Sequence, residues 1–108
     1  MDELLRNPIP SIQLAKHAGE LRYTYHALQR SIERGITTDQ IEAALNAAMV
    51  EVIENYLGGP SPSCLLLVWN QDAHPLHVIV AYGFMEVVTV YVPAPPRWVT
   101  PRTRGGRL

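Results

Sequence analysis

Apolar and polar positions alternate most clearly between Tyr25 and Ile36, with the period of an amphipathic helix. Tyr25, Leu28 and Ile32 fall on one side of that helix, at the spacing of a stripe that packs against a core. Gly35 adopts the left-handed backbone conformation easily, so it is expected to end the helix. The pattern therefore predicts one short helix whose apolar side faces the interior.

The opposite side of the same helix is polar. Its members lie three or four residues apart and so form a single line along the helix: His26, Arg30, Glu33 and Arg34. An imidazole titrates near neutral pH, and guanidinium groups bind phosphate or carboxylate in a bidentate way. The line is therefore a candidate site. The alternative is an ordinary solvated face on which Glu33 pairs with an arginine.

Other helical signals flank this helix. Residues 1–20 have a partial helical period, interrupted by Pro8 and Pro10, and are expected to form an N-terminal helical segment. Thr37 is expected to begin a second strong helix, because Gln40 completes a capping box with it. The apolar stripe predicted for that helix is Ile41, Ala44, Leu45 and Ala48.

From residue 50 onward the period becomes that of strands. Four extended segments are predicted, separated by short turns: residues 50–56, 63–69, 76–82 and 85–92. Short loops join antiparallel neighbours, and helices kept apart from an antiparallel sheet make a two-layer α+β domain. We therefore expect one domain over residues 1–98, with helices on one face of about four antiparallel strands. A flexible arginine-rich tail is expected over residues 99–108.

Composition narrows the function classes. The 108-residue chain has a formal net charge of −1, which disfavours tight nonspecific binding to nucleic acid. The charge is uneven, because the segment from Arg97 onward holds four of the nine basic residues and no acidic one. Cys64 is the only cysteine, so an intramolecular disulfide is excluded and a cytoplasmic location is expected. No stretch is long and apolar enough to cross a membrane.

The face of the sheet away from the helices is a second candidate region. On the last two predicted strands, valines occupy the face expected to meet the helices, and His77, Thr89 and Tyr91 occupy the other face. A loop over residues 82–84 would set His77 opposite Thr89, and a slip of one residue would separate them. The ordinary alternatives are a hydrogen-bonded strand histidine for His77 and a packing aromatic for Tyr91.

These side chains are the ones that a metal-free ribonuclease uses. A base removes the proton of the ribose 2′-hydroxyl, cations stabilise the phosphate, and an acid protonates the leaving oxygen. A histidine would supply the base or the acid, the helix arginines would hold the phosphate, and the strand tyrosine would orient it. The predicted catalytic residues are His26, Arg30, Arg34, His77 and Tyr91, and the predicted substrate-binding residues are Glu33 and Thr89.

No metal site and no cofactor are predicted. His74 and His77 lie near one turn, but the sequence offers no third ligand at a suitable spacing. Cys64 precedes a run of leucines and is expected to pack as a small apolar side chain rather than act as a nucleophile.

Several short sequence motifs lie between Tyr23 and Trp98, and their order and spacing are informative when taken together. They are His26-x3-Arg30-x2-Glu33-Arg34-Gly35-Ile36, Val52-Ile53-Glu54-Asn55-Tyr56, Pro75-Leu76-His77-Val78 and Thr89-Val90-Tyr91-Val92-Pro93. Together they resemble a widespread bacterial and archaeal family of small domains of unknown function. The resemblance implies a fold like that of RelE and BrnT toxins. It also implies a small zinc-finger antitoxin of the MqsA or YgiT type as the partner.

The leading hypothesis is therefore the toxin of a type II toxin–antitoxin pair, which cleaves mRNA or blocks translation and has RNA and an antitoxin as partners. The alternative is a non-catalytic protein-binding module with the same fold. In that alternative, His26 and its arginines form a structural network. The acidic body of the chain favours the alternative.

Overall fold

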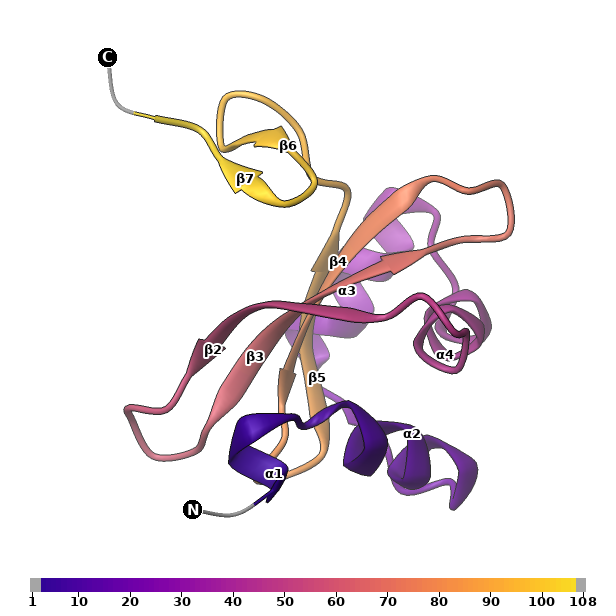
Figure 1. The fold of residues 1–108 in the computed structure, drawn as a ribbon. Coiled ribbons are helices and arrows are strands. Elements are labelled where there is room, and N and C mark those ends of the chain that lie inside the picture. Colours follow the sequence, from indigo (N-terminus) through magenta and orange to yellow (C-terminus); the bar gives the residue numbers. More distant parts are fainter. Residues whose placement is uncertain (1–2, 107–108) are drawn as a thin grey trace.

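Apart from one strand of two residues, helices fill the first half of the chain and strands fill the second half, as the periodicity predicts. A computed structural model describes residues 3–106 of the chain (Figure 1). The helices are α1 (Glu3–Arg6), α2 (Ile9–His17), α3 (Tyr25–Arg34) and α4 (Thr38–Leu45). The strands are β1 (Arg22–Tyr23), β2 (Glu51–Tyr56), β3 (Ser63–Trp69), β4 (Pro75–Ala81), β5 (Glu86–Tyr91), β6 (Trp98–Thr100) and β7 (Thr103–Arg104).

The main sheet has the strand order β1-β5-β4-β3-β2. β2, β3, β4 and β5 pair antiparallel with their neighbours in sequence, as expected, but β1 runs parallel to β5 at the edge. The sheet is therefore mixed and has five strands, where about four antiparallel strands were expected. The additional strand contains only Arg22 and Tyr23, which is too short a segment to leave a periodic signal.

Capping residues define where α3 and α4 begin and end. The Thr24 hydroxyl accepts a hydrogen bond from the Ala27 amide at 2.9 Å and so caps the start of α3. Gly35 follows α3 with a φ of 67°, a conformation that glycine adopts without strain. Thr37 and Gln40 form the predicted capping box at the start of α4. The predicted end of α3 at Gly35 and the predicted start of α4 at Thr37 are therefore confirmed.

The side of α3 that was predicted to face the core is wrong. Tyr25 and Ile32 are 81% and 80% exposed, and Leu28 is 39% exposed. Ala27 and Ser31 face the interior instead, and both are buried. The physical reason is that α3 and β5 approach each other closely. α3 packs along β5, and small side chains fit between a helix and a strand where larger ones would be overpacked.

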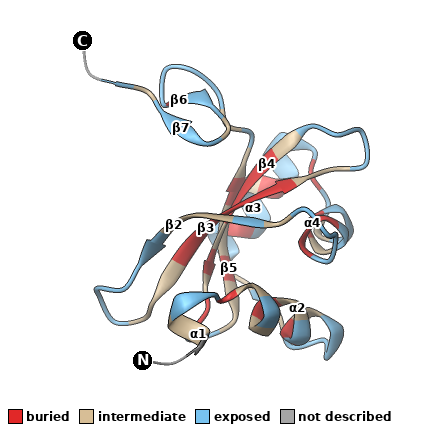
Figure 2. Ribbon diagram, in the orientation of Figure 1, coloured by how far each residue is buried: buried red, intermediate tan, exposed pale blue. Residues whose placement is uncertain are grey.

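The core fills one face of the main sheet, which α2, α3 and α4 cover. β3 and β4 at the centre of the sheet are the most buried strands (Figure 2). Cys64 lies in this core and packs as predicted, whereas Ala48 lies beyond the end of α4 and is exposed. No helix within residues 3–106 is both long and apolar enough to span a membrane. The buried members of the core are Ile12, Ala27, Ile36, Ile41, Ala44, Leu45, Cys64, Leu66, Val68, Leu76, Val78, Val80, Tyr82, Val87 and Val90.

β4 and β5 pair in a register that differs from the predicted one. Their connection spans residues 82–85, one residue more than predicted, and β5 contains a bulge at Val88. His77 consequently lies opposite Tyr91 and not opposite Thr89. The bulge also lets valines on both of its sides face the core, while Thr89 and Tyr91 share the other face.

The flexible tail expected over residues 99–108 instead contains a hairpin of β6 and β7. Arg102 pairs with Glu51 at 2.9 Å, and Arg104 pairs with Glu54 through two hydrogen bonds, so β2 anchors the hairpin. The hairpin lies at the opposite end of the molecule from α1 (Figure 1). The last two residues of the expected tail lie outside the described part of the chain.

We expect Ala27→Leu to destabilise the fold by about 1–3 kcal/mol, because the larger side chain has no room between α3 and β5. Ile32→Ala is the matched substitution on the exposed side of the same helix. It should change the free energy of unfolding by less than about 0.5 kcal/mol. Urea unfolding followed by circular dichroism measures both variants. If Ile32→Ala were the more destabilising change, the apolar stripe and not Ala27 would face the sheet.

Candidate active site

A cleft of about 680 Å³ lies where α3, the end of β5 and the segment leading into the hairpin meet. It brings together three parts of the chain that are far apart in sequence. One side is the polar flank of α3, and the other is formed by residues 92–104. The lining residues are His26, Arg30, Arg34, Ile79, Thr89, Tyr91, Val92, Ala94, Arg97, Trp98 and Arg104.

Two side-chain hydrogen bonds hold α3 beside the edge of β5. β1 pairs with β5 only at the first two residues of β5, so the later carbonyls on that edge need other donors. The Thr24 hydroxyl donates to the Val88 carbonyl at 3.1 Å, and the Arg34 guanidinium donates to the Val90 carbonyl at 3.3 Å. These contacts fix the flank of α3 that carries His26 beside the cleft.

The cleft is cationic although the chain as a whole carries a net charge of −1. Four arginines and one histidine line it, and none of its lining residues is an aspartate or a glutamate. Two of these arginines bond to carboxylates that lie outside the lining: Arg30 to Glu33 at 2.7 Å, and Arg104 to Glu54. Exposed ion pairs of this kind add little stability, but they restrict where the guanidinium groups point. Positive charge is thus concentrated where an anion such as phosphate can enter.

His77 is fully buried behind two residues of the cleft lining, Tyr91 and Trp98. Its Nδ1 atom lies 3.1 Å from the Tyr91 hydroxyl, and its Nε2 atom lies 2.7 Å from the Pro101 carbonyl oxygen. The Trp98 ring packs edge-on against the imidazole, with 4.4 Å between the ring centroids. The Arg104 guanidinium carbon lies 4.8 Å from the Trp98 ring centroid. His77 therefore supports the cleft without lining it.

Burial governs the ionisation of His77 and of Tyr91. It lowers the pKa of His77, and the Pro101 hydrogen bond and the charge of Glu54 offset this only in part. Burial also raises the pKa of the Tyr91 phenol, although a hydrogen bond from the Trp98 indole lowers it. At neutral pH, His77 is therefore uncharged and Tyr91 keeps its proton.

Most of the site residues predicted from the sequence meet in this cleft: His26, Arg30, Arg34, Thr89 and Tyr91 all line it. Glu33 lies outside the lining and bonds to Arg30. His77 does not emerge beside Thr89 as expected, because the bulge in β5 sets it opposite Tyr91. The chemical roles of all these residues stay predictions.

Sequence reasoning did not single out the C-terminal contribution to the cleft, which consists of Arg97, Trp98 and Arg104. The available signal was the run of arginines without acidic residues from Arg97 onward. Composition does not tell where such a segment folds. Here its position depends on ion pairs with Glu51 and Glu54, about fifty residues earlier.

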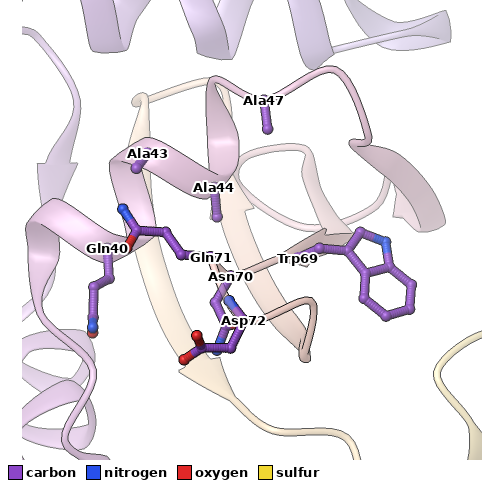
Figure 3. A pocket seen from close by; sticks show the side chains of 8 residues that line it. All are labelled: Gln40, Ala43, Ala44, Ala47, Trp69, Asn70, Gln71 and Asp72. Carbon is purple, nitrogen blue, oxygen red and sulfur yellow. The ribbon is translucent and has the colours of Figure 1, made fainter.

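A smaller hollow of about 210 Å³ lies between α4 and the turn that joins β3 to β4 (Figure 3). Small side chains line it on the α4 side, and Asp72 is its only ionisable residue. Within residues 3–106, no group of three or more His, Cys, Asp or Glu side chains is arranged to hold a metal ion. The cationic cleft thus contains the larger group of side chains suited to acid–base or anion chemistry.

Comparison with known proteins gives one match. A family model described as "Domain of unknown function (DUF4258)" matches residues 23–92, which is more than half of the 108-residue chain. The matched region begins in β1 and ends directly after β5, so it includes α3, α4 and the four antiparallel strands. No curated protein and no solved structure matches the chain.

Lowering the pH from about 7.5 to about 5.5 should destabilise the wild-type protein through His77. Because burial lowers the pKa of His77 below the ordinary value of 6.5, the unfolded chain takes up this proton first as the pH falls. His77→Gln should lose this part of the pH dependence. His74→Gln, which changes an exposed histidine, should keep it.

Urea unfolding at both pH values measures the pH dependence as the difference between two free energies of unfolding. Comparing this difference among the variants removes the direct effect of each substitution on stability. If His77→Gln lost as much stability on acidification as wild type does, His77 would not be the group responsible.

Proposed function

The chain belongs to this family of domains of unknown function, and we propose that it is a toxin of a type II toxin–antitoxin pair that cleaves RNA without a metal ion. One observation carries the proposal. A histidine, a tyrosine and four arginines line a single cleft that contains no acidic side chain, in a chain whose net charge is −1. Segregated positive charge of this kind is suited to a polyanion.

The proposed reaction is attack of a ribose 2′-oxygen on the adjacent phosphorus. The 2′-hydroxyl loses its proton to a base, the bond from phosphorus to the 5′-oxygen breaks, and an acid protonates that oxygen. The products are a 2′,3′-cyclic phosphate and a free 5′-hydroxyl. His26 is the imidazole that lines the cleft, so it is assigned to one of the two proton transfers.

Arginines supply the charge stabilisation in this proposal. Arg30 and Arg34 follow His26 along the same flank of α3, and Arg97 faces them from the C-terminal segment. Guanidinium groups bind the phosphate oxygens in a bidentate way and stabilise the negative charge that grows in the transition state. His77 is buried and cannot reach the substrate, so its contribution passes through Tyr91.

The architecture supports a RelE-like assignment as part of the same proposal. Helices cover one face of a sheet whose four longer strands are antiparallel, and the cleft opens beside the end of the last of them. A toxin of this kind acts in the cytoplasm, where its RNA substrate is found. Its partner would be an antitoxin of the small zinc-finger type.

A non-catalytic protein-binding module is the second candidate, and the exposed side of α3 favours it. Tyr25 and Ile32 are four-fifths exposed, and Leu28 follows the same side of the helix. Apolar side chains at this spacing are typical of a helix that packs against a partner. In this alternative, the Arg34 bond to Val90 fixes the helix and has no catalytic purpose.

We expect purified wild-type protein to cleave single-stranded RNA in the presence of EDTA and to leave 2′,3′-cyclic phosphate ends. His26→Ala should lower the rate by about 10²–10⁴-fold, because one proton transfer loses its side-chain catalyst. Arg34→Gln should also lower it, through weaker phosphate binding. Arg6→Gln is the control, since it removes an exposed arginine of α1 away from the cleft. Fluorescent oligonucleotides followed by gel electrophoresis measure the rates, and circular dichroism checks folding.

Growth after induced expression provides the matching test in cells. Wild type should arrest growth, and His26→Ala should relieve the arrest at an equal level of soluble protein. Folded wild type that neither cleaves RNA nor arrests growth would favour the binding module. Cleavage that survives in His26→Ala would keep the toxin and remove His26 from the mechanism.

A further inference from the structure

The hydrogen bonds of His77 determine how Tyr91 meets whatever enters the cleft. Both imidazole nitrogens have a partner: the Tyr91 hydroxyl at Nδ1 and the Pro101 carbonyl oxygen at Nε2. A carbonyl oxygen only accepts hydrogen bonds, so Nε2 must carry the proton. In a neutral imidazole the other nitrogen is then an acceptor, which requires the Tyr91 O–H to donate to Nδ1.

The Tyr91 proton therefore points away from the cleft. The phenol oxygen accepts the hydrogen bond of the Trp98 indole and keeps one further lone pair, and Tyr91 lines the cleft. The arginines around it only donate hydrogen bonds. The Tyr91 oxygen is thus a hydrogen-bond acceptor, and its bond to the buried His77 fixes its orientation. The charged groups of the cleft are donors.

We infer that Tyr91 accepts a hydrogen bond from a ribose 2′-hydroxyl and so makes the cleft select ribonucleotides over deoxyribonucleotides, with His77 as the positioning residue. The inference rests on the proposed function and adds to it the group that recognises the sugar: Tyr91 binds the 2′-hydroxyl in the ground state, and the proton of this hydroxyl passes to the base when the oxygen attacks. A phosphate oxygen is itself an acceptor and cannot bond to Tyr91 held in this way, so the arginines bind the phosphate and Tyr91 binds the sugar.

The C-terminal hairpin is part of this arrangement. Pro101 lies in the turn between β6 and β7, and its carbonyl oxygen sets the imidazole tautomer. Ion pairs of Arg102 with Glu51 and of Arg104 with Glu54 hold the hairpin against β2. The charged groups nearest to His77 are Glu54 and Arg104, which have opposite signs. The hairpin thus sets the tautomer of His77, and this tautomer makes the Tyr91 oxygen a hydrogen-bond acceptor toward the cleft.

The test compares adenosine 3′-monophosphate with 2′-deoxyadenosine 3′-monophosphate, which carry the same phosphate and differ only in the 2′-hydroxyl. Isothermal titration calorimetry at about pH 7.5, where a histidine with a lowered pKa is neutral, measures both affinities. Wild type should bind the ribonucleotide about five-fold more tightly, which corresponds to one additional hydrogen bond.

Variants separate recognition of the sugar from recognition of the phosphate. Tyr91→Phe should abolish the ribose preference and leave the affinity for the deoxynucleotide unchanged. His77→Phe keeps an aromatic ring beside Trp98 but frees the Tyr91 hydroxyl to rotate and to donate to a phosphate oxygen, so it should weaken the preference. Tyr25→Phe, which removes an exposed hydroxyl outside the cleft, should keep the preference.

Nitrogen-15 NMR of wild-type protein keeps the inference testable even where a variant fails to fold. The proton of His77 should reside on Nε2, and a proton on Nδ1 would overturn the inference whatever the nucleotides do. Equal affinity for the two nucleotides in a protein that cleaves RNA would overturn the inference alone. Folded protein that binds neither nucleotide and cleaves no RNA would overturn both the inference and the proposed function.

Discussion

The structure depends on how the edge of β5 is closed. β1 covers only the first two residues of that edge, and the following carbonyl groups would otherwise be left for another strand to pair with. α3 prevents this, because Thr24 caps the helix and bonds to the Val88 carbonyl, and Arg34 reaches the Val90 carbonyl from the last turn. These two contacts lie at the two ends of α3. They fix how the helix is rotated about its own axis and where it lies along β5. The cleft exists because that rotation turns His26 and Arg30 toward the end of β5.

Charge is arranged so that a slightly acidic protein contains a cationic cleft. Its arginines come from α3 and from the C-terminal segment, and the carboxylates that bond to two of them lie outside the cleft lining. Hydrogen bonds from Arg102 and Arg104 lower the pKa of Glu51 and of Glu54, so both carboxylates are charged at neutral pH. Net charge therefore does not describe the electrostatic field in the cleft, because that field depends on where the charges lie.

The sequence predicted the helices, the strands and the polar flank of α3 because these depend on local signals. Thr24 and Gly35 are capping residues whose effect is confined to one helical turn. The buried side of α3 could not be predicted in this way, since tight packing against β5 selects the small Ala27 and exposes the larger Ile32. The contact between His77 and Tyr91 was not predicted for another reason. It depends on the bulge in β5, and a run of valines contains no sequence signal for a bulge.

His77 connects the stability of the fold to the chemistry of the cleft. Within residues 3–106, no buried side-chain nitrogen or oxygen lacks a hydrogen-bond partner, and the Pro101 carbonyl is what satisfies Nε2 of His77. If the Pro101 carbonyl moved away while Trp98 still covered the imidazole, that nitrogen would be left unsatisfied, at a cost of about 1–3 kcal/mol. The hairpin residues are mostly exposed apart from Trp98 (Figure 2), so the buried Trp98 ring and the polar contacts of Pro101, Arg102 and Arg104 attach the hairpin. A segment held in this way stabilises the buried histidine and directs the Tyr91 hydroxyl through the same hydrogen bond, so neither effect can be lost without the other.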